Sequence, residues 1–148
     1  MRTTISLVAA LAVAAAVVGA GSAFGSSTKA AASVTIRGSD YGRILFDGRG
    51  RALYAFTRDT ARKSNCSGAC ARAWPPYLVT GRVRAGAGVS ASLIGTIRRA
   101  DGKRQVTVAG RPVYFYVGDR KPGQVLCQNV REYGGLWLVI RPNGRLVR

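Results

Sequence analysis

The sequence predicts a mainly β fold in which two tandem repeats, each a β-hairpin or meander, pack into one small domain. The main observation is a pattern at residues 51–59 that returns sixty positions later, at residues 111–119. Each copy has two aromatic residues two positions apart, followed by an aspartate: Tyr54, Phe56 and Asp59, then Tyr114, Tyr116 and Asp119. Side chains alternate between the two faces of a strand, so each copy predicts a strand with both rings on one face and the aspartate in the turn beyond.

A second observation is that the other apolar segments are short and bounded by turn residues, which is typical of strands. The first repeat is expected over residues 34–80, with strands at 34–37, 43–46, 52–57 and 77–79. The turn that begins at Asp47-Gly48 favours a hairpin into the aromatic strand. At most one short helix is expected, near residues 67–73, because Pro75-Pro76 ends it.

The second repeat is expected over residues 93–148, after a linker at 81–92 that is rich in Gly, Ala and Ser. Its predicted strands are 94–98, 105–108, 113–117, 136–140 and 146–147. The turn Asp101-Gly102 favours a hairpin between the first two of these. The run 136–140 is the most strongly apolar, which suggests burial on both faces.

Residues 1–23 are expected to be a signal peptide, followed by a flexible lead-in at 24–33. Arg2 precedes an apolar run that ends at Val18, and Gly21-Ser22-Ala23 offers small residues for cleavage. The run is shorter than the roughly 20 apolar residues that span a bilayer, which favours cleavage over a permanent anchor. We therefore expect the mature chain to be secreted or held in the cell envelope.

The chain is strongly basic, with 23 Lys and Arg, 6 Asp and Glu, and a formal net charge of +17. Such a charge favours anionic partners, namely a membrane or cell-wall surface, a phosphate-bearing polymer or nucleic acid. Export argues against nucleic acid as a specific partner. A protein partner in the envelope is a further candidate, and so is a purely compositional origin of the charge. The sequence does not indicate an oligomeric state.

Histidine is absent from the sequence, which removes the commonest general base and excludes Ser-His and Cys-His catalytic pairs. The few carboxylates show no pattern that indicates a glycosidase. We therefore expect no catalytic residue, no cofactor and no dedicated metal site.

The three cysteines leave two interpretations open. Cys66 and Cys70 are expected to form a disulfide, because the exported setting is oxidising. Alternatively, they form a cycling dithiol or bind a soft metal ion such as Cu(I) or Zn. Three cysteines cannot all pair within one chain, so Cys127 is the candidate for a free thiol or for a bond to another chain.

The aromatic and aspartate pattern also has two interpretations. In the first, which we favour, the rings fill the interior together with Trp74 and Trp137, and Asp59 and Asp119 bond backbone amides of the following turns. In the second, the rings form a shallow site with a carboxylate at its rim that stacks on a flat or sugar-like molecule or holds a cation.

Several motifs occur in the order seen in one known family. They are the two aromatic patterns, Cys66-Ser-Gly-Ala-Cys70-x3-Trp74-Pro-Pro76, and Gly95-Thr-Ile-x-Arg-x-Asp-Gly102 followed by Gln105-Val-Thr. Over residues 38–141 the chain resembles the bacterial secreted-repeat family, whose members are labelled predicted lipoproteins with a Tyr-x-(Phe/Trp/Tyr)-x-x-Asp motif. The resemblance implies secretion and a repeat architecture, with no known function. The chain departs from the lipoprotein label, because it has no cysteine near the cleavage site to accept a lipid.

The sequence thus predicts an exported, non-catalytic binding or structural module that contacts anionic envelope components through Arg-rich faces. The alternative is a thiol-redox or soft-metal-handling protein that uses Cys66 and Cys70.

Overall fold

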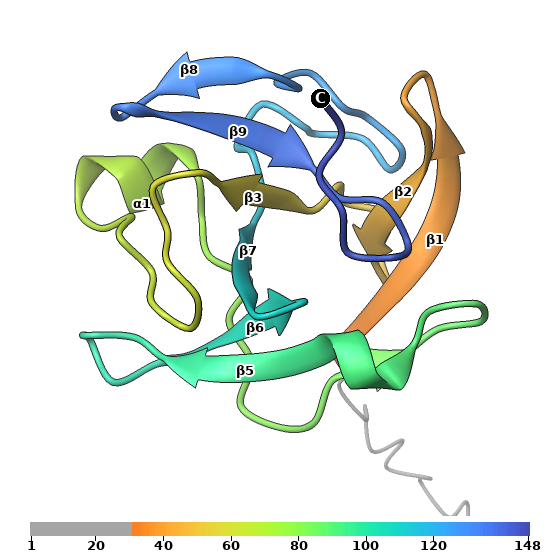
Figure 1. Cartoon of the computed structure of the whole chain (residues 1–148), viewed down its shortest axis with the longest axis horizontal. Coiled ribbons are helices and arrows are strands. Elements are labelled where there is room, and N and C mark those ends of the chain that lie inside the picture. The colour runs from red at the N-terminus through yellow and green to blue at the C-terminus, as the bar shows by residue number, and fades with distance from the viewer. Residues whose placement is uncertain (1–30) are drawn as a thin grey trace, which may run out of the picture.

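The computed structural model describes residues 31–148, which form two β-sheets and very little helix (Figure 1). The elements in chain order are β1 (Ser33–Ser39), β2 (Gly42–Asp47), β3 (Tyr54–Phe56), α1 (Ala69–Ala73), β4 (Arg84–Ala85), the 3-10 helix η1 (Ala91–Leu93), β5 (Ile94–Arg98), β6 (Arg104–Val108), β7 (Arg111–Tyr114), β8 (Val130–Glu132) and β9 (Gly135–Val139). This architecture confirms the predicted mainly β class with one short α-helix. The expected signal peptide, and the part of the expected lead-in before residue 31, lie outside the described residues.

The two sheets do not coincide with the two repeats. The larger sheet has the strand order β5-β6-β7-β3-β9-β8, and the smaller has the order β2-β1-β4. Strand β3 of the first repeat therefore lies between two strands of the second repeat, and it pairs antiparallel with both. The amide of Leu45 in β2 also donates to the carbonyl of Ile140, at 2.9 Å. The repeats share one interior as a result, and Figure 1 shows β1 and β2 on the side opposite α1.

The pairing of β3 with β7 relates the two repeats by an approximate two-fold rotation. Tyr54 lies directly opposite Tyr114 in this antiparallel pair, and the two tyrosines occupy the same position in the sequence repeat. Antiparallel strands that place equivalent residues opposite each other are related by a two-fold axis through that pair. Each aromatic strand therefore meets the other repeat in an equivalent way.

The interior contains two groups of buried side chains. One is aromatic and includes Tyr54, Tyr114, Trp74 and Trp137, all with no exposed surface. The other is mostly aliphatic and packs between β1, β2, β6 and the end of the chain. Full burial of a large apolar side chain stabilises a fold by about 1.5–3 kcal/mol, so the aromatic group is a major contributor to stability.

Some elements differ from the sequence prediction. Residues 77–79 make single bridges and amide bonds to the edge of β6 and β7 without forming a regular strand. The preceding Pro75 and Pro76 have no N–H to donate, which prevents a continuous ladder there. Strand β7 ends at Tyr114. The next amide, that of Phe115, donates to the Pro75 carbonyl at 2.8 Å, but Pro75 has no N–H to donate in return.

Two short elements appear in segments for which the sequence predicts no strand. The expected linker 81–92 contains β4, which runs parallel to β1, as well as the first residues of η1. Strand β8 is an edge strand with one apolar residue, Val130, so it lacks a hydrophobic pattern. Within residues 31–148, no helix has the length and apolar character needed to cross a membrane.

Candidate functional site

The two tyrosines at the centre of the repeat form reciprocal hydrogen bonds with the aspartates of the opposite repeat. The Tyr54 hydroxyl donates to Asp119 Oδ2 at 2.6 Å, and the Tyr114 hydroxyl donates to Asp59 Oδ2 at 2.7 Å. Burial is the main reason that the pKa of both tyrosines lies well above the ordinary value, and the neighbouring carboxylates add to it. Both phenols therefore stay protonated and act as donors at neutral pH.

The second oxygen of each aspartate holds the turn that follows its strand. Asp59 Oδ1 accepts the amide of Asn65 at 2.6 Å, and Asp119 Oδ1 accepts the amide of Leu126 at 2.9 Å. Burial raises the pKa of both carboxyl groups, while their hydrogen bonds act in the opposite direction. Each aspartate thus combines the predicted turn contact with a bond between the repeats. The second contact depends on the pairing of β3 with β7, which the sequence does not reveal.

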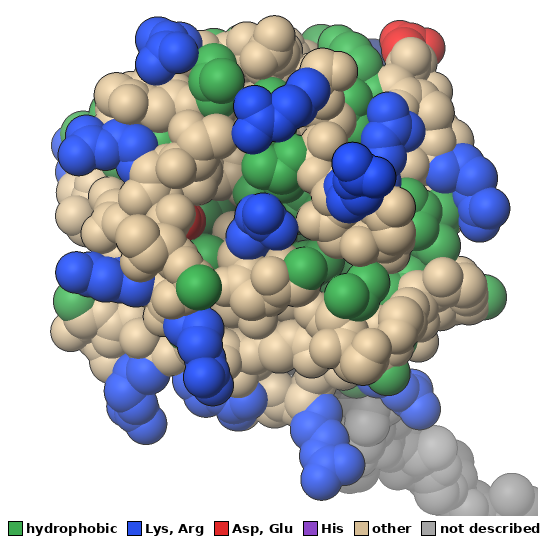
Figure 2. Space-filling view, viewed as in Figure 1, with side chains coloured by type: hydrophobic (Ala, Val, Ile, Leu, Met, Phe, Trp, Pro, Cys, Tyr) green, Lys and Arg blue, Asp and Glu red, His purple; other side chains and the backbone are tan. Residues whose placement is uncertain are grey.

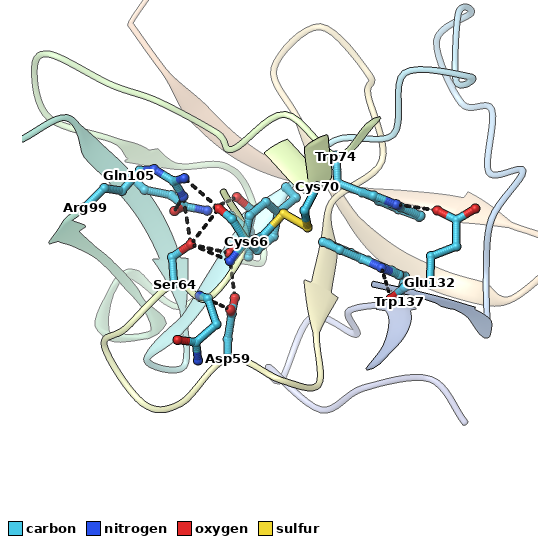
Figure 3. Close-up of a disulfide and its surroundings, with 12 residues drawn as sticks. Asp59, Ser64, Cys66, Cys70, Trp74, Arg99, Gln105, Glu132 and Trp137 are labelled. Carbon is cyan, nitrogen blue, oxygen red and sulfur yellow. Dashed lines mark hydrogen bonds between the residues drawn. A yellow bond between two sulfur atoms is a disulfide. The ribbon is translucent and has the colours of Figure 1, made fainter. Parts of the chain in front are cut away.

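Four aromatic rings form a column through the interior. The Trp74 and Trp137 rings are stacked with centroids 4.0 Å apart and an interplanar angle of 5°. Phe56 stacks on Trp137 at 4.2 Å, and Tyr116 packs on Trp74 at 4.8 Å. Both indole nitrogens donate to Glu132, Trp74 to its carboxylate at 2.8 Å and Trp137 to its backbone carbonyl at 3.3 Å (Figure 3). These rings are packed against one another, so no space for a flat ligand remains between them.

One end of this column borders a shallow hollow of about 340 Å³. Its lining includes Phe56, Asp59 and Arg111 together with the C-terminal Arg148. Phe56 is only 4% exposed, and Tyr54 and Tyr114 have no exposed surface at all. The hollow therefore touches the repeat pattern at Phe56 and Asp59 and does not reach the rings of Tyr54 or Tyr114.

The structure confirms the predicted disulfide between Cys66 and Cys70, whose Cα atoms lie 5.3 Å apart at the start of α1. Both cysteines are buried in the aromatic group. Cys127 is a half-buried free cysteine, and burial raises the pKa of its thiol. The thiol lies beside Tyr116 and raises the pKa of that tyrosine to about 12. Residues 31–148 contain no group of three or more His, Cys, Asp or Glu side chains placed to hold a metal ion.

A chain of hydrogen bonds runs from Asp59 to a buried arginine that sequence reasoning missed (Figure 3). The Tyr114 hydroxyl is 2.7 Å from Ser64 Oγ, and Arg99 Nη1 donates to that same oxygen at 2.8 Å. Tyr114 uses its proton on Asp59, so the serine must donate to the tyrosine. The guanidinium also donates to Gln105 Oε1 at 2.6 Å and to the Cys66 carbonyl at 2.7 Å.

A second hollow of about 340 Å³ lies beside this chain of bonds and is lined by cations. Its lining residues are Arg62, Lys63, Ser64, Arg98, Arg99 and Ala100. The first three follow β3 in the first repeat, and the last three follow or end β5 in the second. The sequence shows only isolated basic pairs, so the cluster arises from the fold. Four cations line this hollow, whereas two line the hollow beside Phe56.

Comparison with known proteins found one family and no individual relative. Neither the curated proteins nor the solved structures gave a significant match. A family model described as a secreted repeat of unknown function matched residues 35–77 and again residues 95–141. The two matches follow the two structural repeats, and each contains one aromatic and aspartate pattern. The chain therefore belongs to the family of secreted repeats of unknown function and carries two copies of the repeat.

Proposed function

We propose that this secreted-repeat protein is a non-catalytic module of the cell envelope that contacts anionic surface components through Arg-rich faces. Cleavage after residue 23 would release the mature chain, which keeps nearly all of the positive charge. The observation that carries the proposal is the unequal placement of charge. Acidic side chains are largely used in internal contacts, and basic side chains face the solvent.

Four of the six acidic residues are engaged inside the fold. Asp47 is 3% exposed and pairs with Arg51 at 2.9 Å. Asp59 and Asp119 bind the two buried tyrosines, and Glu132 accepts the Trp74 indole. Only two ion pairs occur within residues 31–148, the second being Arg99 with Asp101 at 3.8 Å. Most basic side chains of the described part therefore have no acidic partner.

The unpaired cations are spread over the molecular surface. On the face in Figure 2, Lys and Arg side chains occur from edge to edge and acidic side chains are rare. A field of one sign over the whole surface attracts anionic surfaces over several ångströms and increases the association rate. Each Lys or Arg near an anionic membrane contributes about 1 kcal/mol to binding, so a modest patch is enough for envelope association.

The alternative, a thiol-redox or soft-metal function for Cys66 and Cys70, has less support. The two cysteines are 1% and 7% exposed. Thiol exchange requires a thiolate to reach a sulfur atom of the disulfide, and this burial restricts such access. The absence of histidine from the sequence and the burial of the aromatic pattern support the non-catalytic part of the proposal.

We expect the mature protein to bind anionic vesicles much more strongly than neutral ones, with binding that salt abolishes. The Debye length shortens from about 10 Å at 0.1 M salt to about 3 Å at 1 M, so charge attraction is screened. Co-sedimentation with phosphatidylglycerol vesicles and with phosphatidylcholine vesicles at both salt concentrations measures this. Equal binding to the two vesicle types at the lower salt concentration would contradict the proposal.

A further inference from the structure

We propose that the cationic hollow bordered by Arg62, Lys63, Arg98 and Arg99 is a binding site for a phosphate group. The inference rests on the proposed function, because it names the chemistry that one part of the basic surface recognises. The ligand is a phosphate mono- or diester of the envelope, or free phosphate, since both present the same oxyanion to the site.

The composition of the hollow favours an oxyanion. Four of its six lining residues are cations, one carries a hydroxyl, and none is a carboxylate. Arg99 forms an ion pair with Asp101, in which Asp101 Oδ2 lies 3.8 Å from Arg99 Nε. The Asp101 side chain is 48% exposed. Arginine donors match phosphate oxygens in a bidentate geometry, and lysine adds a compact charge. A hollow of about 340 Å³ is small for a ligand pocket, which suits a single head group.

Arg99 is held in place before any ligand arrives. Its side chain is 7% exposed, and three acceptors bind its two terminal nitrogens. Its Nε is the single buried side-chain nitrogen or oxygen in residues 31–148 that has no hydrogen-bond partner. A buried cation with an unsatisfied donor is unfavourable for stability alone. A site that is already ordered loses less conformational entropy when it binds.

The repeat itself does not require this arginine. The position sixty residues earlier in the other repeat is Ser39, whose hydroxyl donates to the Gly42 carbonyl at 2.8 Å. The equivalent tyrosine and aspartate pair, Tyr54 with Asp119, forms without an arginine bound to it. The cationic cluster is therefore an addition at one end of a nearly symmetric core, which is the pattern expected of a binding site.

The test compares two variants that remove the same charges from different places. Arg62→Gln with Lys63→Gln changes the hollow, and Arg82→Gln with Lys121→Gln removes one Arg and one Lys from exposed loops elsewhere. None of these four side chains makes a hydrogen bond or ion pair within residues 31–148, and all four are exposed. Both variants should therefore fold, which thermal unfolding followed by circular dichroism checks. Arg99 is left unchanged.

Calorimetric titration with inorganic phosphate at constant ionic strength is the main readout. We expect the hollow variant to lose phosphate affinity by about tenfold or more, whereas the control variant stays within about twofold of the unchanged protein. Vesicles that contain phosphatidic acid identify the source of the phosphate. A larger loss for the hollow variant on vesicles than with inorganic phosphate indicates a lipid head group, and the reverse indicates free phosphate.

The two variants would behave alike in both titrations if the hollow were not a site. Equal, small losses combined with retained binding of the unchanged protein to anionic vesicles would overturn this inference and leave the proposed function standing. Failure of the unchanged protein to bind either inorganic phosphate or anionic vesicles would overturn both.

Discussion

Trp137→Ala is expected to lower the free energy of unfolding by about 3–5 kcal/mol, the usual loss when a buried tryptophan is removed from a core. The Trp137 ring has no exposed surface and stacks between Phe56 and Trp74, at 4.2 and 4.0 Å. It also meets the Tyr114 ring edge-on at 5.2 Å. Its removal leaves a cavity that three rings cannot fill by small shifts. Urea unfolding followed by circular dichroism measures the loss.

Two matched variants show whether this loss comes from the stacked ring. Trp137→Phe keeps an aromatic face between the two neighbours, so it should lose clearly less stability than the alanine variant. Tyr133→Ala removes an aromatic ring that is 44% exposed, and should change stability by no more than about 0.5 kcal/mol. If Trp137→Ala lowered the free energy of unfolding by less than about 1 kcal/mol, the stacked column would contribute little to the stability of the protein.

The bond between Tyr54 and Asp119 is expected to be the most important polar contact between the repeats. Tyr54→Phe should destabilise the protein by about 1.5–3 kcal/mol, the range for hydrogen bonds to charged groups. Asp119→Ala should destabilise it more, because it also leaves the Leu126 amide without its acceptor. Equilibrium unfolding of each variant and of the double variant completes a double-mutant cycle.

The cycle should show strong coupling, since each residue is the other's buried partner at 2.6 Å. We expect an interaction energy of at least about 1 kcal/mol, within the range for residues in direct contact. Asp40→Ala is the control, because Asp40 is exposed and makes no hydrogen bond within residues 31–148. Additive effects of Tyr54→Phe and Asp119→Ala would mean that the pair does not join the repeats energetically.

The elements that the sequence predicts well are those set by local patterns. Short apolar segments bounded by turn residues identify β2, β5 and β6, and the Asp101-Gly102 turn identifies the hairpin between the last two. The oxidising setting favours the disulfide between Cys66 and Cys70, which the structure contains. Each of these features depends on residues close together in the chain, where periodicity and turn chemistry are informative.

The features that the sequence does not predict depend on which strands become neighbours. A period of two assigns the faces of β3 but does not select β7 and β9 as its partners. The bonds from Tyr54 to Asp119 and from Tyr114 to Asp59 both follow from that choice of partners. The same holds for the cationic hollow, whose residues come from two segments more than thirty positions apart. The sequence repeat does offer one indication. Equivalent residues of the two copies, such as Tyr54 and Tyr114, are candidates to lie opposite each other across a two-fold axis.

The central claim is that the repeated aromatic pattern forms the interior and leaves recognition to the outward cations. Trp74 and Trp137 are the two tryptophans of the chain and both have no exposed surface, so acrylamide quenching of their fluorescence tests this claim directly. We predict weak quenching in the folded protein, unchanged when anionic vesicles are bound. Quenching as strong as in the urea-unfolded chain, or protection that appears only when vesicles bind, would contradict it.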